Sequence, residues 1–469
     1  MSSSKQIIKN LFSMSVAELA GKGLAVVFSI YLIKIIGPEN NGALTIAKAS
    51  VQAVLVFVLL GFDQVGIREI ARDKNRINTY VGSIVTLRVV IAIITYALLF
   101  AFFEFALGDV SEKTKIATYI YGIMLLSNSI QLNWVFQAVE RMHIIAVRSI
   151  LVNVSNLIGL IIFVRSEDDF FTAVWIIVLS FFVNVVWMII YYIRYYGFPV
   201  FKYSKSFIKS LSYESMRVGF VFILLSMYNI ITVQFLSIYH GDYQTGIYGA
   251  AFQIIVFSLI PATIMQGAFF PQLSQMSSIE DRNSLMSKFM MLNLLSGVLI
   301  SFSMFTFSDS IIWILGDKYE KTSTLIKILS PTILIQYISS AYFSTLISWK
   351  REKLVMFANL AGFIAVIAIN ILLVPHYGFY GAAIATVVCE LSVLIVIMII
   401  FYNTLKRLHL ETIKPLFLIS LPLFGFAFLA LDYGINTFIV ALFSLIVYIF
   451  LVVKFKILNI QEIRNVFRR

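Results

Sequence analysis

The chain has 469 residues, of which 60% are hydrophobic and only 13% are charged, about half the charged share of ordinary soluble proteins. Its one cysteine, Cys389, excludes an intrachain disulfide. The net charge of +12 is divided among short stretches between apolar segments, which argues against a nucleic-acid-binding surface. Those stretches are too short to form an aqueous domain with its own core. The sequence therefore excludes a soluble enzyme and predicts a membrane-embedded protein.

Apolar segments of about 20 residues follow one another from Ile7 to Phe455. Each can cross the ~30 Å hydrocarbon core of a bilayer as a helix, and backbone amides in lipid must pair within their own helix. We therefore predict an all-α polytopic membrane protein with about 14 transmembrane helices. In chain order they are expected at residues 7–36, 43–67, 79–103, 116–138, 144–164, 170–196, 211–239, 244–270, 285–308, 323–348, 354–374, 380–403, 415–431 and 435–454.

Lys and Arg are divided unevenly between the loops on the two sides of these helices. The loops on the side of the N-terminus carry 25 of them, including Arg141 and Arg148, and the opposite loops carry five. Cytoplasmic loops of membrane proteins carry the excess of Lys and Arg. The distribution therefore predicts that both termini are cytoplasmic.

Two turns share the pattern G-x4-G, namely GPENNG at 37–42 and GDYQTG at 241–246, with an offset of 204 residues. The offset indicates two parallel six-helix repeats with a substrate path at their interface. We predict lobes at 1–205 and 206–405, followed at 406–469 by a transmembrane hairpin and a basic cytoplasmic tail. The alternative is ordinary turn chemistry, since glycines gather in turns.

Six cations remain after the 30 assigned to loops, and they lie within predicted helices, where a charge costs at least about 2.5 kcal/mol and normally faces a cavity or a partner. They are Lys22, Lys34, Lys48, Arg88, Arg217 and Lys327. Lys22 and Arg88 lie near mid-helix and are expected to face a cavity. For the other four, the alternative is that the side chain extends to the headgroup surface.

Three acids within the predicted helices, namely Glu18, Asp63 and Glu390, are candidates for coupling to H⁺ or Na⁺. Glu18 and Lys22 are four residues apart, so they share a helix face and can pair. The surplus of cations over acids favours a substrate with negative charge, such as a phosphate. The guanidinium of Arg88 would bind a phosphate through two parallel hydrogen bonds.

Uncharged polar residues gather on the predicted helix 116–138. The candidates for sugar contacts are Gln131, Asn133, Trp134 and Gln137. Amides and indoles can hydrogen-bond sugar hydroxyls, but they can equally form contacts between helices. The sequence leaves both interpretations open.

The motifs of several enzyme classes are absent. The chain has no G-x4-G-K-[ST] phosphate loop, no Cys/His cluster with metal-ligand spacing and no G-x-S-x-G motif. We therefore predict that the protein is not an enzyme and needs no metal or other cofactor.

Four segments resemble the polysaccharide flippases, the O-antigen and capsule repeat-unit transporters of the superfamily that also contains the MATE antiporters and the lipid II flippases. They are IIGPENNGALTIAKA (35–49), LLGFDQVGIREIAR (59–72), NWVFQAVERMHIIAVRSI (133–150) and LVPHYGFYGAAIATVVCE (373–390). The third segment is similar to the family's W-x-x-Q-x-x-E-[KR]-M pattern and is the most specific of the four.

The resemblance implies two six-helix lobes in a V-shaped, alternating-access fold in the bacterial cytoplasmic (inner) membrane. The implied substrate is an oligosaccharide joined through pyrophosphate to a polyprenyl lipid, turned from the cytoplasmic to the outer leaflet for surface polysaccharide or lipopolysaccharide assembly. Polysaccharide polymerase and glycosyltransferases would be partners. The predicted extra helix pair is more like the lipid II flippases, in which these helices contribute a groove for the lipid tail. A lipid II flippase and a cation-coupled drug or metabolite antiporter of the MATE type therefore remain alternatives.

Overall fold

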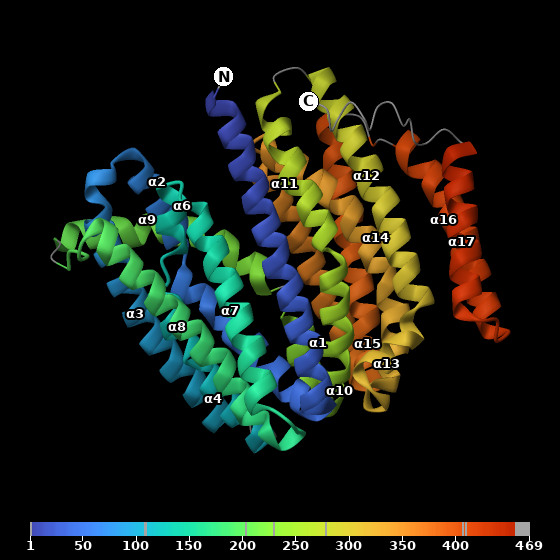
Figure 1. Cartoon of the computed structure of the whole chain (residues 1–469), viewed down its shortest axis with the longest axis horizontal. Helices are drawn as coiled ribbons and strands as arrows, with labels where there is room; N and C mark the ends of the chain where they lie inside the picture. The colour runs from blue at the N-terminus through green and yellow to red at the C-terminus, as the bar shows by residue number, and fades with distance from the viewer. Residues whose placement is uncertain are drawn as a thin grey trace. The chain divides into compact units, whose positions relative to one another are not determined.

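The computed structural model describes residues 2–106, 110–201, 204–227, 230–276, 279–405, 408 and 410–454. Side chains are described from Ala20 onward, apart from those at 218, 220–227, 279, 405, 410, 412–413, 415–417, 421 and 453. The described residues form helices joined by short turns, with no strand among them (Figure 1). This agrees with the all-α class predicted from the sequence.

The chain divides into two compact units, residues 1–249 and 250–469. Unit 1 contains α1 (Ser2–Leu59), α2 (Phe62–Arg72), α3 (Ile77–Ala101), α4 (Glu112–Gly122), α5 (Met124–Ser129), α6 (Asn133–Ala138), α7 (Met142–Phe163), α8 (Phe170–Tyr196) and α9 (Lys205–Met227). Helix α10 (Ile231–Ser258) begins in unit 1 and ends in unit 2. Unit 2 continues with α11 (Ile260–Gln275), α12 (Ile279–Thr306), α13 (Ile311–Leu315), α14 (Glu320–Ser348), α15 (Glu352–Leu405), α16 (Leu410–Asp432) and α17 (Thr437–Lys454). The predicted lobes 1–205 and 206–405 and the tail 406–469 stay a prediction.

Eight helical stretches of the described chain are long and apolar enough to cross a membrane. They are Ala20–Arg72, Lys74–Ala106, Met142–Phe163, Glu167–Tyr196, Ile231–Gln275, Glu280–Thr306, Asp317–Ser348 and Glu352–Thr404, and Leu418–Asp432 and Thr437–Val452 are shorter apolar helices. Three of the eight contain a glycine with non-helical backbone, namely Gly37, Gly241 or Gly378, at which two helices are joined across a kink. A total of fourteen spans stays a prediction.

The predicted helix 116–138 is wrong as a single helix, because the structure divides it into α4, α5 and α6. Side chains at the break compete for the backbone: Asn128 Nδ2 donates to the carbonyl of Met124 (2.8 Å), and Ser129 Oγ donates to that of Leu126 (2.6 Å). Such local bonds offer the backbone an alternative to the regular helix. The predicted helix 211–239 is likewise divided, into α9 and α10.

The two G-x4-G turns meet inside unit 1, where the lower ends of α1 and α10 lie side by side in Figure 1. Gly37 and Gly241 both have positive φ, 75° and 68°, which favours glycine. Gly42 and Gly246 serve a different purpose, because a Cβ on Gly246 would lie 1.7 Å from the carbonyl oxygen of Pro38 and one on Gly42 would lie 1.8 Å from that of Asp242. The second glycine of each turn therefore permits backbone-to-backbone contact between the turns.

Hydrogen bonds add to this contact. Asn41 Nδ2 donates to the carbonyl of Gly246 (2.8 Å), and the carboxylate of Asp242 accepts from Ser111 (2.5 Å) and Thr114 (2.8 Å) at the start of α4. Both turns thus form one junction of α1, α4 and α10 in unit 1. Their shared spacing has a packing function beyond ordinary turn chemistry.

Candidate functional site

Among the cations of unit 1 whose side chains the structure describes, Arg88, in the middle of α3, is the least exposed. Its side chain is 1% exposed, and its Nη2 lies 2.7 Å from Oδ1 of Asp63, which is 34% exposed. The guanidinium carbon lies 5.9 Å from the ring centroid of Phe62, and Nε has no hydrogen-bond partner among the described residues. Arg88 therefore holds one strong bond to an acid and keeps unused donor capacity.

The backbone before α2 positions Asp63 for this pair. Leu60 and Gly61 have φ of 35° and 74°, and α2 begins directly after them with Asp63 in its first turn, where a helix dipole favours an acid. Gly219 of α9 packs against this step, since a Cβ there would lie 2.5 Å from the carbonyl carbon of Leu60. The Arg88–Asp63 pair is thus held at the junction of α1, α2, α3 and α9.

Four other predicted cations of unit 1 have more accessible side chains. Lys22 and Lys48 of α1 are half-buried, whereas Lys34 of α1 and Arg217 of α9 are exposed. Arg217 lies 5.9 Å from the ring centroid of Tyr213. The cavity role of these four cations stays a prediction.

Lys327, in α14 of unit 2, is paired with Asp309, its Nζ 3.0 Å from both carboxylate oxygens. Burial raises the pKa of Asp309, but hydrogen bonds from Ser323 and Lys327 lower it more, so the pKa lies below its usual range. Asp309 therefore stays charged opposite Lys327 at neutral pH. This pair was not predicted, because Asp309 lies outside the predicted helices.

The three predicted acids have different surroundings. Glu390 of α15 is 7% exposed, and its Oε1 accepts a hydrogen bond from Gln336 Nε2 of α14 (2.8 Å). Asp63 is the partner of Arg88. The side chain of Glu18 lies outside the described residues, as does the predicted Glu18–Lys22 pair. A role in ion coupling stays a prediction for all three.

The polar set of the predicted helix 116–138 is split by the break in that helix. Trp134 is 2% exposed and packs against Gly66, where a Cβ would lie 2.3 Å from its Cζ3. Neither Trp134 Nε1 nor Asn133 Oδ1 has a hydrogen-bond partner among the described residues. Gln131 is half-buried and Gln137 exposed. Trp134 is thus part of the core of unit 1, and sugar contacts by these residues stay a prediction.

Sequence reasoning missed Arg148 by counting it among the loop cations, although the predicted helix 144–164 contains it. The structure places it inside α7, which begins at Met142, with two guanidinium nitrogens buried and without hydrogen-bond partners in the described part of the chain. The sequence holds one signal that identifies Arg148 as unusual, namely the lack of acidic residues in the two neighbouring segments. Neither the segment of α7 nor that of α8 contains an acidic residue that would neutralise it.

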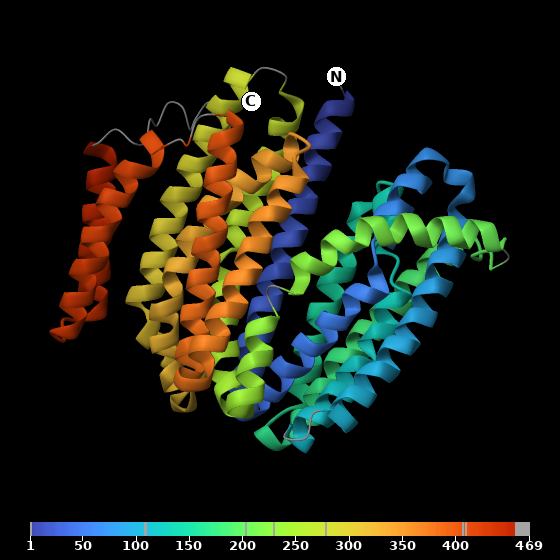
Figure 2. The ribbon, with the colours of Figure 1, turned by 180° about the vertical axis from the view of Figure 1, so that it is seen from behind.

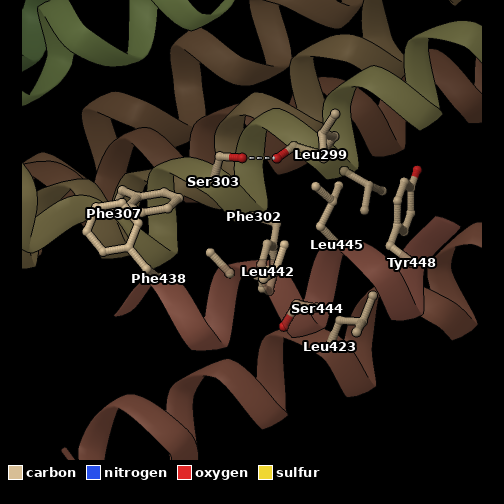
Figure 3. A pocket seen from close by; sticks show the side chains of 12 residues that line it. Leu299, Phe302, Ser303, Phe307, Leu423, Phe438, Leu442, Ser444, Leu445 and Tyr448 are labelled. Carbon is tan, nitrogen blue, oxygen red and sulfur yellow. Dashed lines mark hydrogen bonds between the residues drawn. The ribbon is translucent and has the colours of Figure 1, made fainter. Parts of the chain in front are cut away.

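Unit 2 contains an apolar cavity of about 280 Å³ where α16 and α17 pack against α12 (Figure 3). Its lining side chains come from all three helices, among them Phe302 of α12, Leu423 of α16 and Leu442 of α17. Ser444 also lines it, is buried, and has no hydrogen-bond partner for its hydroxyl among the described residues. A second space of about 540 Å³ lies between α16 and α17, which run side by side in Figure 2. Both spaces suit hydrocarbon.

Comparison with solved structures defines the class of this fold. "Lipid II flippase MurJ, inward closed conformation" superposes with a TM-score of 0.74 at 14% identity, covering 95% of this chain and 98% of that one. An inward-facing multidrug resistance MATE family transporter of the MOP superfamily gives 0.69 at 12% identity, covering 84% and 98%. The fold is therefore that of the MOP superfamily, and the chain is a multi-pass membrane protein.

The family is given by sequence. Residues 7–277, more than half of the chain, match the family described as "Polysaccharide biosynthesis protein", and residues 218–372 match MatE. The chain belongs to the polysaccharide biosynthesis protein family, a family of transporters and not of enzymes, as its lack of catalytic motifs predicted.

Two curated proteins are similar to it. The "Putative O-antigen transporter" of Shigella dysenteriae is 24% identical over 377 residues, which is 78% of this chain and 92% of that protein. The Escherichia coli K12 protein of the same name is 25% identical over 166 residues, 34% of this chain and 39% of that one. The flippase family predicted from four segments is confirmed.

Proposed function

We propose that this protein moves a polyprenyl-pyrophosphate-linked oligosaccharide repeat unit from the cytoplasmic to the outer leaflet of a bacterial cytoplasmic membrane. The observation that carries the proposal is the similarity to the Shigella dysenteriae protein, which extends over 92% of that protein's length. The substrate would serve assembly of O-antigen, capsule or a related surface polymer. Glycosyltransferases would supply this substrate, and polysaccharide polymerase would consume it.

The charge of the chain supports a substrate with a pyrophosphate. Arg88 is buried beside Asp63 with unused donors, and a guanidinium binds phosphate oxygens through two parallel bonds. In this proposal the phosphate displaces Asp63 from Arg88. Lys22 and Arg217 contribute to the same binding path, and Lys34, Lys48 and Lys327 make it cationic.

Transport would follow alternating access between two six-helix lobes in a V-shaped arrangement, with fourteen spans and both termini in the cytoplasm. The 25-to-5 distribution of Lys and Arg supports the orientation. A coupling ion, H⁺ or Na⁺, would act through Asp63, Glu18 or Glu390. Binding of the coupling ion to the carboxylate of Asp63 would release Arg88 for the phosphate, because Asp63 is the partner of Arg88.

The cavity between α12, α16 and α17 is proposed to hold part of the polyprenyl tail, as the resemblance to lipid II flippases implies. Replacing Ser444 by phenylalanine should fill the cavity and reduce surface polysaccharide several-fold at an unchanged protein level, measured by immunoblot and glycan staining. The matched control is Ile446→Phe, on the same helix but exposed and away from the lining of both cavities. Equal loss in both variants would contradict the tail site.

The test of the function is deletion of the gene, followed by analysis of surface polysaccharide and of undecaprenyl-linked intermediates. Loss of the polymer, with repeat units accumulating in the cytoplasmic leaflet, is the expected result. Growth arrest with accumulated lipid II and unchanged polysaccharide would instead identify a lipid II flippase. A change in drug resistance with both lipid pools unchanged would identify a MATE-type antiporter.

A further inference from the structure

Arg148 is a half-buried cation of unit 1 for which the described structure provides no acid. It lies in α7, six residues after Met142, and its Nε and Nη1 are buried without hydrogen-bond partners in the described part of the chain. The guanidinium carbon lies 5.6 Å from the ring centroid of Phe181 in α8. Helices α7 and α8 contain no Asp or Glu from one end to the other.

Such an arrangement is costly in a membrane protein. A charge within a membrane-spanning helix normally pairs with another charge or lines a water-filled or ligand-filled path. The aromatic ring of Phe181 stabilises the cation only in part, and the N–H groups of two buried nitrogens, Nε and Nη1, stay unsatisfied. A cation retained at this cost indicates that its partner is an anion from outside the chain.

The surroundings of Arg148 are held in place by packing against α1. A Cβ on Gly21 would lie 3.1 Å from Ser149 Oγ, and Asn153 Nδ2 donates both to the carbonyl of Gly21 (3.1 Å) and to that of Ser149 (2.9 Å). Lys22 follows Gly21 directly, and Arg148 directly precedes Ser149. The contact between α1 and α7 at Gly21 therefore brings the backbones of Lys22 and Arg148 near each other. One turn beyond Asn153 on α7, the buried Oδ1 of Asn156 has no hydrogen-bond partner among the described atoms.

We propose that Arg148 is an oxyanion-binding residue of the transport path, with Phe181 beneath the guanidinium and Lys22 adding charge. The oxyanion is a phosphate group of the polyprenyl pyrophosphate carried under the proposed function, on which this inference rests. Arginine suits this position because its planar donors bind two phosphate oxygens at once. The site is separate from Arg88, whose guanidinium has an acid partner in the chain.

Binding to the purified full-length protein in lipid nanodiscs tests the proposal. The probes are undecaprenyl pyrophosphate and, for comparison, undecaprenol, which lacks the phosphates. Arg148→Gln should weaken binding of the pyrophosphate about tenfold, leave undecaprenol binding unchanged, and keep or raise the thermal unfolding temperature because an unpaired buried charge is removed. Arg148→Lys should restore binding in part. The matched control is Arg194→Gln, an exposed arginine at the end of α8, which should bind as the wild type does.

Three results would overturn the assignment. Equal pyrophosphate affinity in the wild type and Arg148→Gln would remove Arg148 from the site while leaving the proposed function in place. If Arg148→Gln and Glu18→Gln both lowered the unfolding temperature by the same amount, Arg148 would be the partner of Glu18 within the chain. Failure of the wild type itself to bind the pyrophosphate would overturn the proposed function together with this site.

Discussion

Replacing Arg88 by alanine is expected to abolish surface polysaccharide while the protein still inserts in the membrane. The variant lacks the guanidinium that would bind the phosphate. Asp63, which then has no partner, is one-third exposed and can be solvated by water, so the protein should still fold. Asp63→Ala should be the more destabilising of the two. It leaves a guanidinium that is 1% exposed without an acid, at a cost of about 3–5 kcal/mol.

A double variant separates binding from structure. A buried ion pair replaced by apolar residues of similar size is often neutral or stabilising, so Arg88→Met combined with Asp63→Leu should unfold at or above the wild-type temperature. It should nevertheless fail to restore polysaccharide in a deletion strain. Normal polysaccharide in a stable double variant would contradict the role of Arg88 in phosphate binding and reduce the pair to a structural contact.

Gly246→Ala is expected to be the most damaging single-methyl change in unit 1. The new Cβ would lie 1.7 Å from the carbonyl oxygen of Pro38 and 2.8 Å from the amide nitrogen of Gly42. Both are backbone atoms, so no rotamer change can relieve the overlap, and the turns must separate at a cost of about 3 kcal/mol or more. Gly42→Ala, against the carbonyl of Asp242, should have a similar effect.

Thermal unfolding in detergent and polysaccharide complementation measure this effect. The control is Gly267→Ala in α11, where a Cβ meets nothing within 4 Å and alanine should stabilise the helix by roughly 0.5–1 kcal/mol. If Gly246→Ala unfolded at the same temperature as Gly267→Ala, the contact between the two turns would not be required.

Some of the chemistry was visible in the sequence because it depends on single segments. Arg88 and Asp63 both stand out as charges within apolar stretches, and a charge in such a stretch requires a partner wherever the helix lies. Their pairing was not predicted, because 25 residues separate them and the facing sides of α2 and α3 depend on the kink at Leu60 and Gly61. Trp134 was interpreted as a candidate sugar contact, and its burial against Gly66 follows from the packing of α6 on α2.

The sequence by itself determined that this protein is helical and membrane-embedded, because span length and hydropathy are properties of each segment alone. The four segments at 35–49, 59–72, 133–150 and 373–390 also identified the family. The tertiary structure alone decided that the second glycine of each turn touches the backbone of the other turn and that Asp63 pairs with Arg88. It also decided that two guanidinium nitrogens of Arg148 are buried without a hydrogen-bond partner among the described residues. The physical reason is that a contact between two helices depends on which side of each helix faces the other. That orientation is set by kinks and by packing between residues far apart in the sequence.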